Sequence, residues 1–356
     1  GVEAVTVKLD YSPSPTPPAT QPVGCDTSVC PQEFFNDPAG TETSGEYGFC
    51  PCDQCRYFTV TPEKNDNPLN GVTTYDLVLI SKHILGNPTF DSPFKMIAAD
   101  ANKSGSVTTF DVVELRKLIL GIYTELPTNT SWRFVEKAVT STWNPLNPFA
   151  STIYGYVDEI DMVANTANEI DFVAVKIGDV NYSAMANRPA ERPISTISWS
   201  GSKAKKGEVL TIPVTYSEAE PLEAIQLGLR YDPAVLQLLG PSQGELAAWG
   251  PDNFNLSTPG EVRTLWLPAD PSDPEQMLTQ GKVLFYLTFK VNAAIPESGL
   301  PIWLDNTLLD NAAWRNDGTE CALAHGNAEI LQRTSPNGQA LTANCRPNPS
   351  SGQLTF

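Results

Sequence analysis

The chain has 356 residues, with 41 acidic and 23 basic side chains and a formal net charge of −18. This length is enough for two or three domains, each with a hydrophobic core. The acidic composition disfavours nucleic acid as a partner because phosphate contacts need basic patches, and no run of about 18 apolar residues that could cross a membrane as a helix occurs.

The N-terminal segment, residues 1–23, combines a predicted strand with a linker. Residues 2–10 alternate apolar and polar side chains, and residues 12–22 contain five prolines, which is typical of an extended linker. A tethered strand cannot fold alone, so it pairs either within its own chain, for example with the chain's own sandwich, or with the sheet edge of a neighbouring molecule. The second alternative would be a route to polymerisation.

Residues 24–58 form a cysteine-rich segment. It contains five of the seven cysteines, and the other two lie near the C-terminus; they are Cys25, Cys30, Cys50, Cys52, Cys55, Cys321 and Cys345. Only two histidines are present, so a zinc site would need mostly thiolates. The calcium loops and Asn-rich turns described below suit an extracellular or outer-cell-surface location, where disulfides persist. We therefore favour disulfides, and the odd count leaves one thiol free or joined to another chain.

Residues 59–122 contain an internal repeat. Residues 72–86 and 107–121 are identical at nine of fifteen positions, with an offset of 35. Apolar residues recur at helical spacing in the second copy, and Gly121 is placed to end the helix. The sequence therefore predicts two copies of one loop–helix unit packed on each other.

The loop before the second helix has the composition of a calcium site. Calcium is a hard cation that takes six to eight oxygen ligands. Gly105, the sixth residue of this twelve-residue loop, permits a sharp turn. The predicted ligands are Asp100, Asn102, Ser104, Ser106 through its backbone carbonyl, and Asp111.

The first loop is a candidate for a second calcium ion. Counting back from Asp76, Asn65 and Asn67 hold the first and third positions, whereas Leu69 has no ligand to offer at the fifth. Asn70 replaces the glycine and would have to adopt a left-handed conformation, which Asn tolerates. The alternative is that the Asn70–Gly71 pair is only a turn.

These two units resemble dockerin domains over about residues 60–122. The second loop matches the dockerin pattern, and the first departs from it at Leu69 and Asn70. The resemblance implies that calcium folds the module and that its helices bind a cohesin domain. Residues 123–190 are expected to pack with this module. Asp179 and Asn181 have the spacing of another loop start, but nothing downstream completes it.

Residues 191–335 are predicted to form an antiparallel β-sandwich. Apolar and polar residues alternate over 206–216, 222–231 and 281–291, and residues 300–304 form a further predicted strand. The order of these segments, and Tyr231–Leu236 in particular, resembles cohesin domains. The predicted fold class is mainly β, a cohesin- or immunoglobulin-like sandwich, with a small α-helical dockerin-like calcium-binding module in a multidomain chain.

The C-terminal segment, residues 336–356, contains Pro347-Asn348-Pro349, a turn of small residues and a final Leu-Thr-Phe. It resembles the start of a type IX secretion C-terminal sorting domain. The resemblance implies export across a Gram-negative outer membrane and surface attachment. Because the chain does not begin with Met, we interpret it as a processed or fragmentary product.

The sequence contains no catalytic motif. A nucleophile elbow, a phosphate loop and a His-Glu-x-x-His helix are all absent, and acidic pairs such as Asp158 and Asp161 are expected by chance among 41 acids. We therefore expect a non-enzyme. The leading hypothesis is a secreted, calcium-stabilised structural subunit of an extracellular filament or cell-surface adhesin. Copies would assemble into a homopolymer by module docking, strand addition or both.

The alternative hypothesis is a non-catalytic scaffold module that recognises polysaccharide or a partner's dockerin or cohesin. Trp199, Trp249 and Trp314 are candidates for stacking on sugars, whereas Trp266 and Trp303 lie in apolar alternation and are expected in the core. Whether the two modules meet within one chain or between chains is open at this level.

Overall fold

A computed structural model describes residues 5–11, 57–144, 147–150, 157–161, 170–184, 192–199, 204–297 and 299–326. The cysteines from Cys25 to Cys55, together with Cys345, lie outside these residues, as do the proline-rich linker and the predicted sorting segment. Cys321 is buried in β15 (Glu320–His325).

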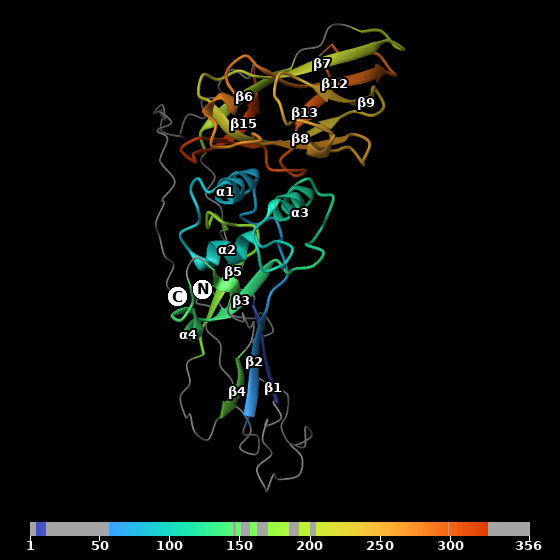
Figure 1. Ribbon diagram of the computed structural model, residues 1–356. Coiled ribbons are helices and arrows are strands. Elements are labelled where there is room, and N and C mark those ends of the chain that lie inside the picture. Colours follow the sequence, from blue (N-terminus) through green and yellow to red (C-terminus); the bar gives the residue numbers. More distant parts are fainter. Residues whose placement is uncertain are drawn as a thin grey trace, which may run out of the picture.

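The predicted β-sandwich is confirmed, and it occupies one end of the molecule (Figure 1). The sheet order is β10-β11-β8-β14-β15-β6-β7-β12-β9, with β13 beside β8. Neighbouring strands are antiparallel except β15 and β6, and the sheet curls so that β7, β12 and β9 lie over β8. Its other strands are β6 (Ile194–Trp199), β7 (Val209–Tyr216), β8 (Leu222–Tyr231), β9 (Leu236–Gln243), β10 (Phe254–Asn255), β11 (Glu261–Trp266), β12 (Val283–Val291), β13 (Ile302–Leu304) and β14 (Ala312–Arg315).

The sandwich core follows from the alternation of the strands. One face of β12 contributes Phe285, Leu287 and Phe289, which meet alternate residues of β7 and β8 in a single cluster. Trp249, in the loop after β9, packs edge-on against Phe285 with ring centroids 4.9 Å apart. Short 3-10 turns, η2 (Pro251–Asn253) and η3 (Pro274–Gln276), lie in the connections.

The repeat forms helices α1 (Thr74–Leu85) and α3 (Thr109–Ile119). Each begins with a capping box, in which Thr73 pairs with Asp76 and Thr108 with Asp111. Between them lies α2 (Pro93–Ala99), which periodicity did not predict because it spans only two turns. Its start is marked by Pro at the first helical position after a capping Ser92.

Residues after α3 complete this helical module. Strands β3 (Trp132–Glu136) and β5 (Phe172–Lys176) pair antiparallel. In the chain, β3 is followed by α4 (Lys137–Thr140) and the 3-10 turn η1 (Pro148–Ala150). Gly178, just past β5, has φ +90, and a Cβ there would lie 2.8 Å from Leu115 and 2.9 Å from Val72. The glycine therefore allows the β5 end to press directly against α3 and the start of α1.

A three-stranded sheet of order β1-β2-β4 extends from the module at the end opposite the sandwich (Figure 1). The predicted N-terminal strand is observed as β1 (Thr6–Tyr11), which pairs antiparallel with β2 (Tyr57–Glu63). The third strand is β4 (Val157–Asp161). Within the described residues, β1 thus pairs in its own chain, but with β2 rather than with the sandwich.

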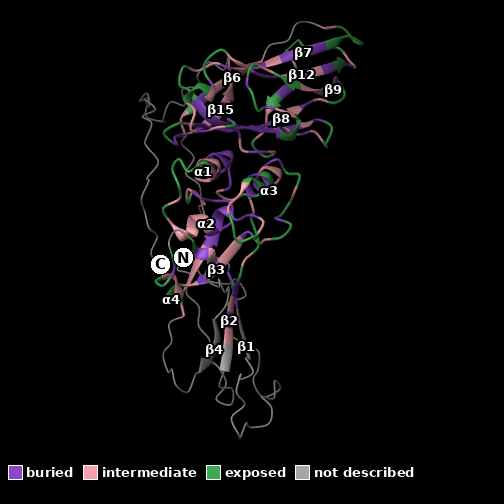
Figure 2. Ribbon diagram, in the orientation of Figure 1, coloured by how far each residue is buried: buried purple, intermediate pink, exposed green. Residues whose placement is uncertain are grey.

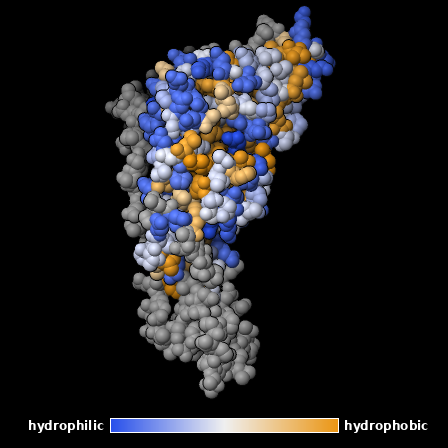
Figure 3. Space-filling view, viewed as in Figure 1, coloured by the Kyte–Doolittle hydropathy of each residue, from blue (hydrophilic) through white to orange (hydrophobic). Residues whose placement is uncertain are grey.

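Burial is concentrated between the layers. Figure 2 shows β8 buried along its length, with the sandwich core on one side and the helices on the other. Figure 3 shows apolar side chains reaching the surface only in patches among hydrophilic ones on this face. None of the helices in the described part of the chain has the length and apolarity needed to cross a membrane.

Substituting Gly178 by Ala tests the close packing at the β5 end. We expect the free energy of unfolding to fall by about 3 kcal/mol, from backbone strain and from the clash with Leu115 and Val72. Gly207→Ala is the matched control, because Gly207 also has positive φ, +93, but has no atom within 4 Å of its Cβ position. The control should cost only about 1–2 kcal/mol. Equal losses in urea unfolding would contradict the packing argument.

Candidate docking interface and ion-binding loops

Helix α1 lies on the outer face of the sandwich, and its first turn is bonded to β8. The backbone N–H and hydroxyl of Thr74 both donate to Gln226 Oε1, at 3.0 and 2.9 Å. The Gln226 amide in turn donates to the carbonyl of Asp310 at 2.9 Å. Because Thr74 and Gln226 are both buried, these bonds satisfy polar groups that would otherwise be costly to bury.

An aromatic pair continues the contact. Tyr75 stacks on Trp314 of β14 with ring centroids 6.3 Å apart and ring planes 9° from parallel. Both are buried, at 8% and 2% exposed, and burial raises the pKa of the Tyr75 phenol above its usual value. The ring therefore acts as a neutral anchor between α1 and the sheet.

A buried ion pair joins the last turn of α1 to the start of β8. The ammonium of Lys82 contacts the carboxylate of Glu223, which is fully buried. Burial raises the pKa of Glu223, and the nearby Lys82 opposes that rise. Removing either partner would leave the other charge in a low-dielectric layer, so this pair specifies the register of α1 on the sheet.

The end of α3 completes the interface at the neighbouring strands. Asn255 of β10 donates from Nδ2 to the carbonyl of Leu120 at 2.8 Å, and Arg263 of β11 lies against Gly121. The sheet contributes small and apolar side chains to the helical core cluster; they are Ala224, Leu265, Leu267, Leu309, Ala312 and Trp314. We call this contact of α1 and the α3 end with β8, β10, β11 and β14 the docking interface. It is formed within one chain, which answers the question that the sequence left open.

The repeat makes α3 a second copy of the docked surface, but the equivalent residues in its N-terminal half are exposed to solvent. On α1, Thr74, Tyr75 and Lys82 contact side chains of the sheet, and Val78 belongs to the core cluster that the sheet shares. The counterparts of these four residues 35 positions later are Thr109, Phe110, Val113 and Lys117. Phe110 is 72% exposed and Val113 38% exposed, whereas Tyr75 and Val78 are buried. We call Thr109, Phe110 and Val113 the open face of α3.

The predicted calcium loop 100–111 brings its oxygen atoms together. Asp100 accepts hydrogen bonds from the N–H groups of Ser104 and Gly105, at 2.8 and 3.0 Å. Asn102 Oδ1 accepts from Ser104 N at 3.0 Å, and Asp111 accepts from Asn102 N at 3.1 Å. The hydroxyl of Ser104 contacts the carbonyl of Ser106 at 3.2 Å. All five predicted ligands therefore belong to one compact loop.

A second loop of the same design is assembled from two distant segments. Asp179 accepts from Ser183 N and Ala184 N, at 3.0 and 2.8 Å. Asn181 Oδ1 also accepts from Ser183 N at 3.0 Å, and the Ser183 hydroxyl donates to the carbonyl of Gly71 at 3.0 Å. The same contacts occur in the continuous loop. There Asp100, Asn102, Ser104, Gly105 and Ser106 take the places of Asp179, Asn181, Ser183, Ala184 and Gly71 respectively.

Asp76 completes this split loop, as Asp111 completes the continuous one. Its carboxylate accepts from Val180 N at 3.0 Å and from the N–H and hydroxyl of Thr73, both at 2.9 Å. The two segments abut where Ala184 meets Gly71, because a Cβ on Gly71 would lie 2.5 Å from Ala184 N. The loop start at Asp179 is thus completed by residues that lie upstream in the sequence, and not by residues downstream of it.

The other two residues predicted for the first loop lie elsewhere. Asn65 Oδ1 accepts from the backbone N–H of Ser131 at 2.8 Å, and Asn67 is an exposed turn residue with φ +45. The expectation that Asn70 adopts a left-handed conformation is wrong, since Asn67 and Gly71 are the residues with positive φ in this turn.

Both loops hold buried carboxylates beside one basic side chain. Burial raises the pKa of Asp76, of Asp179 and of Asp111, and the charge of Asp179 raises that of Asp76 further. Burial also lowers the pKa of Lys176, near the split loop, to about 8. In the continuous loop, Arg133 Nη1 lies 3.9 Å from Asp100 Oδ2.

The chemistry of the donors fits a hard cation. Carboxylate, amide, hydroxyl and carbonyl oxygens make up both loops, which is the ligand type of calcium. Within the described ranges, no three His, Cys, Asp or Glu side chains form a metal-binding cluster, so a zinc-type site is not among the described residues. Each loop instead pairs two aspartates with neutral oxygen donors.

The tryptophans considered for sugar stacking are placed differently from the prediction. Trp249 and Trp314 are 1% and 2% exposed, so neither can stack on a ligand. Trp266 is in the core as expected, but Trp303 is 47% exposed and that expectation is wrong. Trp303 lies on the short strand β13, where alternation does not reveal which face is covered.

Comparison with known proteins identifies the sandwich. Residues 195–327 match the family model of the Cohesin domain, and this part of the chain has the cohesin β-sandwich fold. No curated protein sequence matches the chain.

Solved structures of cohesins also align with part of the chain. The sixth cohesin of scaffoldin B from Acetivibrio cellulolyticus, solved in complex with a dockerin, is 15% identical over 37% of this chain and 93% of that chain, with a TM-score of 0.32. Type II cohesin A11 from Bacteroides cellulosolvens is 17% identical over 37% and 94%, with a TM-score of 0.29. A non-cellulosomal cohesin from the hyperthermophilic archaeon Archaeoglobus fulgidus is 20% identical over 37% and 85%, with a TM-score of 0.27.

The repeat offers a matched pair of substitutions that tests the docking interface. Tyr75→Ala should lower the free energy of unfolding by about 3–4 kcal/mol, because it empties a buried site against Trp314. Phe110→Ala, at the equivalent position of α3, should change it by less than about 0.5 kcal/mol because the ring is in solvent. Urea unfolding followed by tryptophan fluorescence measures both. Similar losses for the two variants would show that α1 and α3 are not used differently.

Proposed function

We propose that this chain is a non-catalytic, calcium-stabilised structural subunit of an extracellular assembly, a filament or a surface adhesin. Its cohesin domain and its dockerin-like helical module form a closed pair within the chain. The observation that carries the proposal is the unequal use of the repeat, with α1 docked on the sheet and the open face of α3 exposed at Phe110 and Val113. Contacts with other copies or partners then use α3.

The closed pair restricts how copies can join. Because α1 is tethered beside its own sheet, its effective local concentration exceeds that of a helix from another molecule. The sheet face around Gln226 and Trp314 is therefore not open to a second dockerin-like helix unless α1 leaves. A partner that offers a free sheet of this kind would bind the open face of α3. In a homopolymer, the α3 of one copy would occupy the sheet of the next only after the α1 of that next copy has left it.

An association experiment tests this part of the proposal. The wild-type protein at micromolar to millimolar concentration, with calcium present, should form oligomers or filaments in analytical ultracentrifugation and negative-stain microscopy. Phe110→Ala should abolish them without lowering the melting temperature. Leu85→Ala is the control, since Leu85 is an exposed apolar residue of α1, 54% exposed, outside the open face. Monomers of wild type under all conditions would contradict self-assembly, and a binding partner would then be sought with the same variants.

We also propose that the two oxygen-lined loops each bind one calcium ion. The continuous loop would use Asp100, Asn102, Ser104, Ser106 and Asp111. The split loop would use Asp179, Asn181, Ser183, Gly71 through its carbonyl, and Asp76. Bound calcium would neutralise the facing aspartates and tie the segment after β5 to the start of α1.

Calcium stoichiometry distinguishes the split loop from the loop that begins at Asn65. Isothermal titration calorimetry with calcium, on protein made metal-free with a chelator, should give two bound ions for wild type and one for Asp179→Ala. The variant loses the carboxylate at the first position of the split loop. Asn67→Ala should still bind two ions, since Asn67 is a solvent-exposed turn residue. If Asn67→Ala bound one ion and Asp179→Ala still bound two, the loop that begins at Asn65 would be supported instead. Absence of calcium binding in wild type would overturn both sites.

A further inference from the structure

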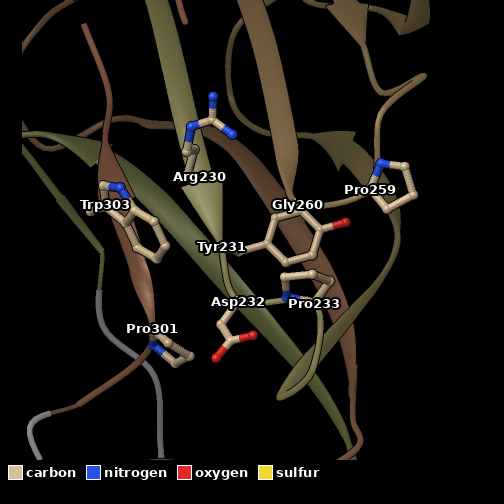
Figure 4. A pocket seen from close by; sticks show the side chains of 8 residues that line it. All are labelled: Arg230, Tyr231, Asp232, Pro233, Pro259, Gly260, Pro301 and Trp303. Atoms are coloured by element: carbon tan, nitrogen blue, oxygen red, sulfur yellow. The ribbon is translucent and has the colours of Figure 1, made fainter. Parts of the chain in front are cut away.

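A shallow pocket lies at the end of β8, on the cohesin domain (Figure 4). Its volume is about 430 Å³, within the range of small-ligand sites. The lining comes from the end of β8, the turn after it, the turn before β11, and β13; the residues are Arg230, Tyr231, Asp232, Pro233, Pro259, Gly260, Pro301 and Trp303.

Trp303 is the aromatic platform of this pocket. Among the seven tryptophans, all of them within the described residues, it alone is exposed, whereas the others are buried or half-buried. A large apolar ring that is exposed to water at the wall of a pocket indicates a binding surface, because a ligand that covers the ring removes apolar area from water. In Figure 4 the indole stands beside the Arg230 side chain, with its six-membered ring toward the pocket.

Planar polar groups lie next to that ring in a fixed arrangement. Arg230 on β8 is paired across the sheet with Trp303 on β13 and, on its other side, with Glu261 on β11. Its guanidinium donates to Asp305 and, at 2.9 Å, to Glu261. Hydrogen bonds from Thr307 and from Arg230 lower the pKa of Asp305 to about 2. The guanidinium is therefore held by anions at neutral pH and does not have to be ordered when a ligand arrives.

The walls are rigid for a separate reason. Pro233, Pro259 and Pro301 form the rim, and proline loses little conformational freedom on binding. Tyr231 is 6% exposed and packs edge-on against Phe289, 5.1 Å between centroids. Consequently the pocket offers one accessible aromatic face, with polar groups beside it.

Charge and shape select the ligand class. The lining carries one arginine, Arg230, and one carboxylate, Asp232, and the Arg230 guanidinium already donates to Asp305 and Glu261, so little positive charge is left to attract an anionic polymer. A proline-rich peptide docks along grooves lined by several aromatic side chains, and only one is accessible here. A pyranose ring has one flat C–H face for an indole and peripheral hydroxyls for a guanidinium and a carboxylate.

We propose that the Trp303 pocket binds one ring of a neutral polysaccharide, stacked on the indole and hydrogen-bonded through its hydroxyls to Arg230 and Asp232. The site lies on the cohesin domain and depends on neither the docking proposal nor the calcium proposal. It would attach the subunit to a cell wall or an extracellular matrix.

Affinity gel electrophoresis tests this site with soluble neutral polysaccharides, namely hydroxyethylcellulose, xylan and laminarin, and with anionic polygalacturonate for comparison. The wild-type chain should be retarded by at least one neutral polymer and not by polygalacturonate. Trp303→Ala should weaken binding at least about tenfold, equivalent to about 1.4 kcal/mol. Trp303→Phe should retain part of the affinity. Leu239→Ala is the matched control, because Leu239 is an apolar side chain of β9 that is 54% exposed and does not line the pocket.

Several outcomes would overturn the proposal. They are the absence of retardation in every neutral polymer, and equal retardation of wild type and Trp303→Ala when both melt at the same temperature. If Trp303→Ala melts early, Trp303→Phe decides. A partial loss of affinity in a stably folded Trp303→Phe supports stacking on the indole, because the smaller phenyl ring still offers an aromatic face, whereas unchanged binding or complete loss argues against it. Trp303-dependent binding of a synthetic peptide of residues 12–22, without binding of polysaccharide, would reassign the pocket to proline-rich segments.

Discussion

The arrangement of this protein depends on one buried carboxylate, that of Asp76. It caps α1 through Thr73 and accepts a hydrogen bond from Val180, 104 positions away in the sequence. A fully buried carboxylate is tolerated only where such donors surround it. Asp76 therefore sets the position of the first turn of α1 and, with it, the residues Thr74 and Tyr75 that reach the sheet of the cohesin domain. The docking interface follows from a constraint that lies outside the interface itself.

The two helices of the repeat lie in different environments because the sheet accommodates only one of them along its length. Gln226, Trp314 and Glu223 are presented once, on β8 and β14, and α1 meets all three. Helix α3 touches the sheet only by its last turn, near Asn255 and Arg263. The open face of α3 therefore remains uncovered because the helix is repeated in the sequence, whereas the sheet surface that binds such a helix is present only once. That asymmetry is the basis for proposing α3 as the contact to other molecules.

The candidate sites were predictable only where their residues are adjacent in the sequence. All proposed ligands of loop 100–111 fall within twelve residues, so spacing alone indicated them. In the split loop, the run from Asp179 to Ser183 repeats the spacing of the run from Asp100 to Ser104, and the run from Gly71 to Asp76 repeats that of the run from Ser106 to Asp111. Each half carried a recognisable pattern, but joining them needs the contact between Ala184 and Gly71, which spacing in one dimension cannot show.

The sequence by itself determined the local structure and the fold class, because strand alternation, capping boxes and loop spacing depend on near neighbours. It also indicated the cohesin domain, through the pattern around Tyr231–Leu236. Only the tertiary structure decided which chain α1 docks on, which residues accompany Asp76, and which face of β13 is open to solvent at Trp303. These outcomes depend on which surfaces meet after long-range packing, and alternation gives two faces to a strand without stating which of them another element will cover.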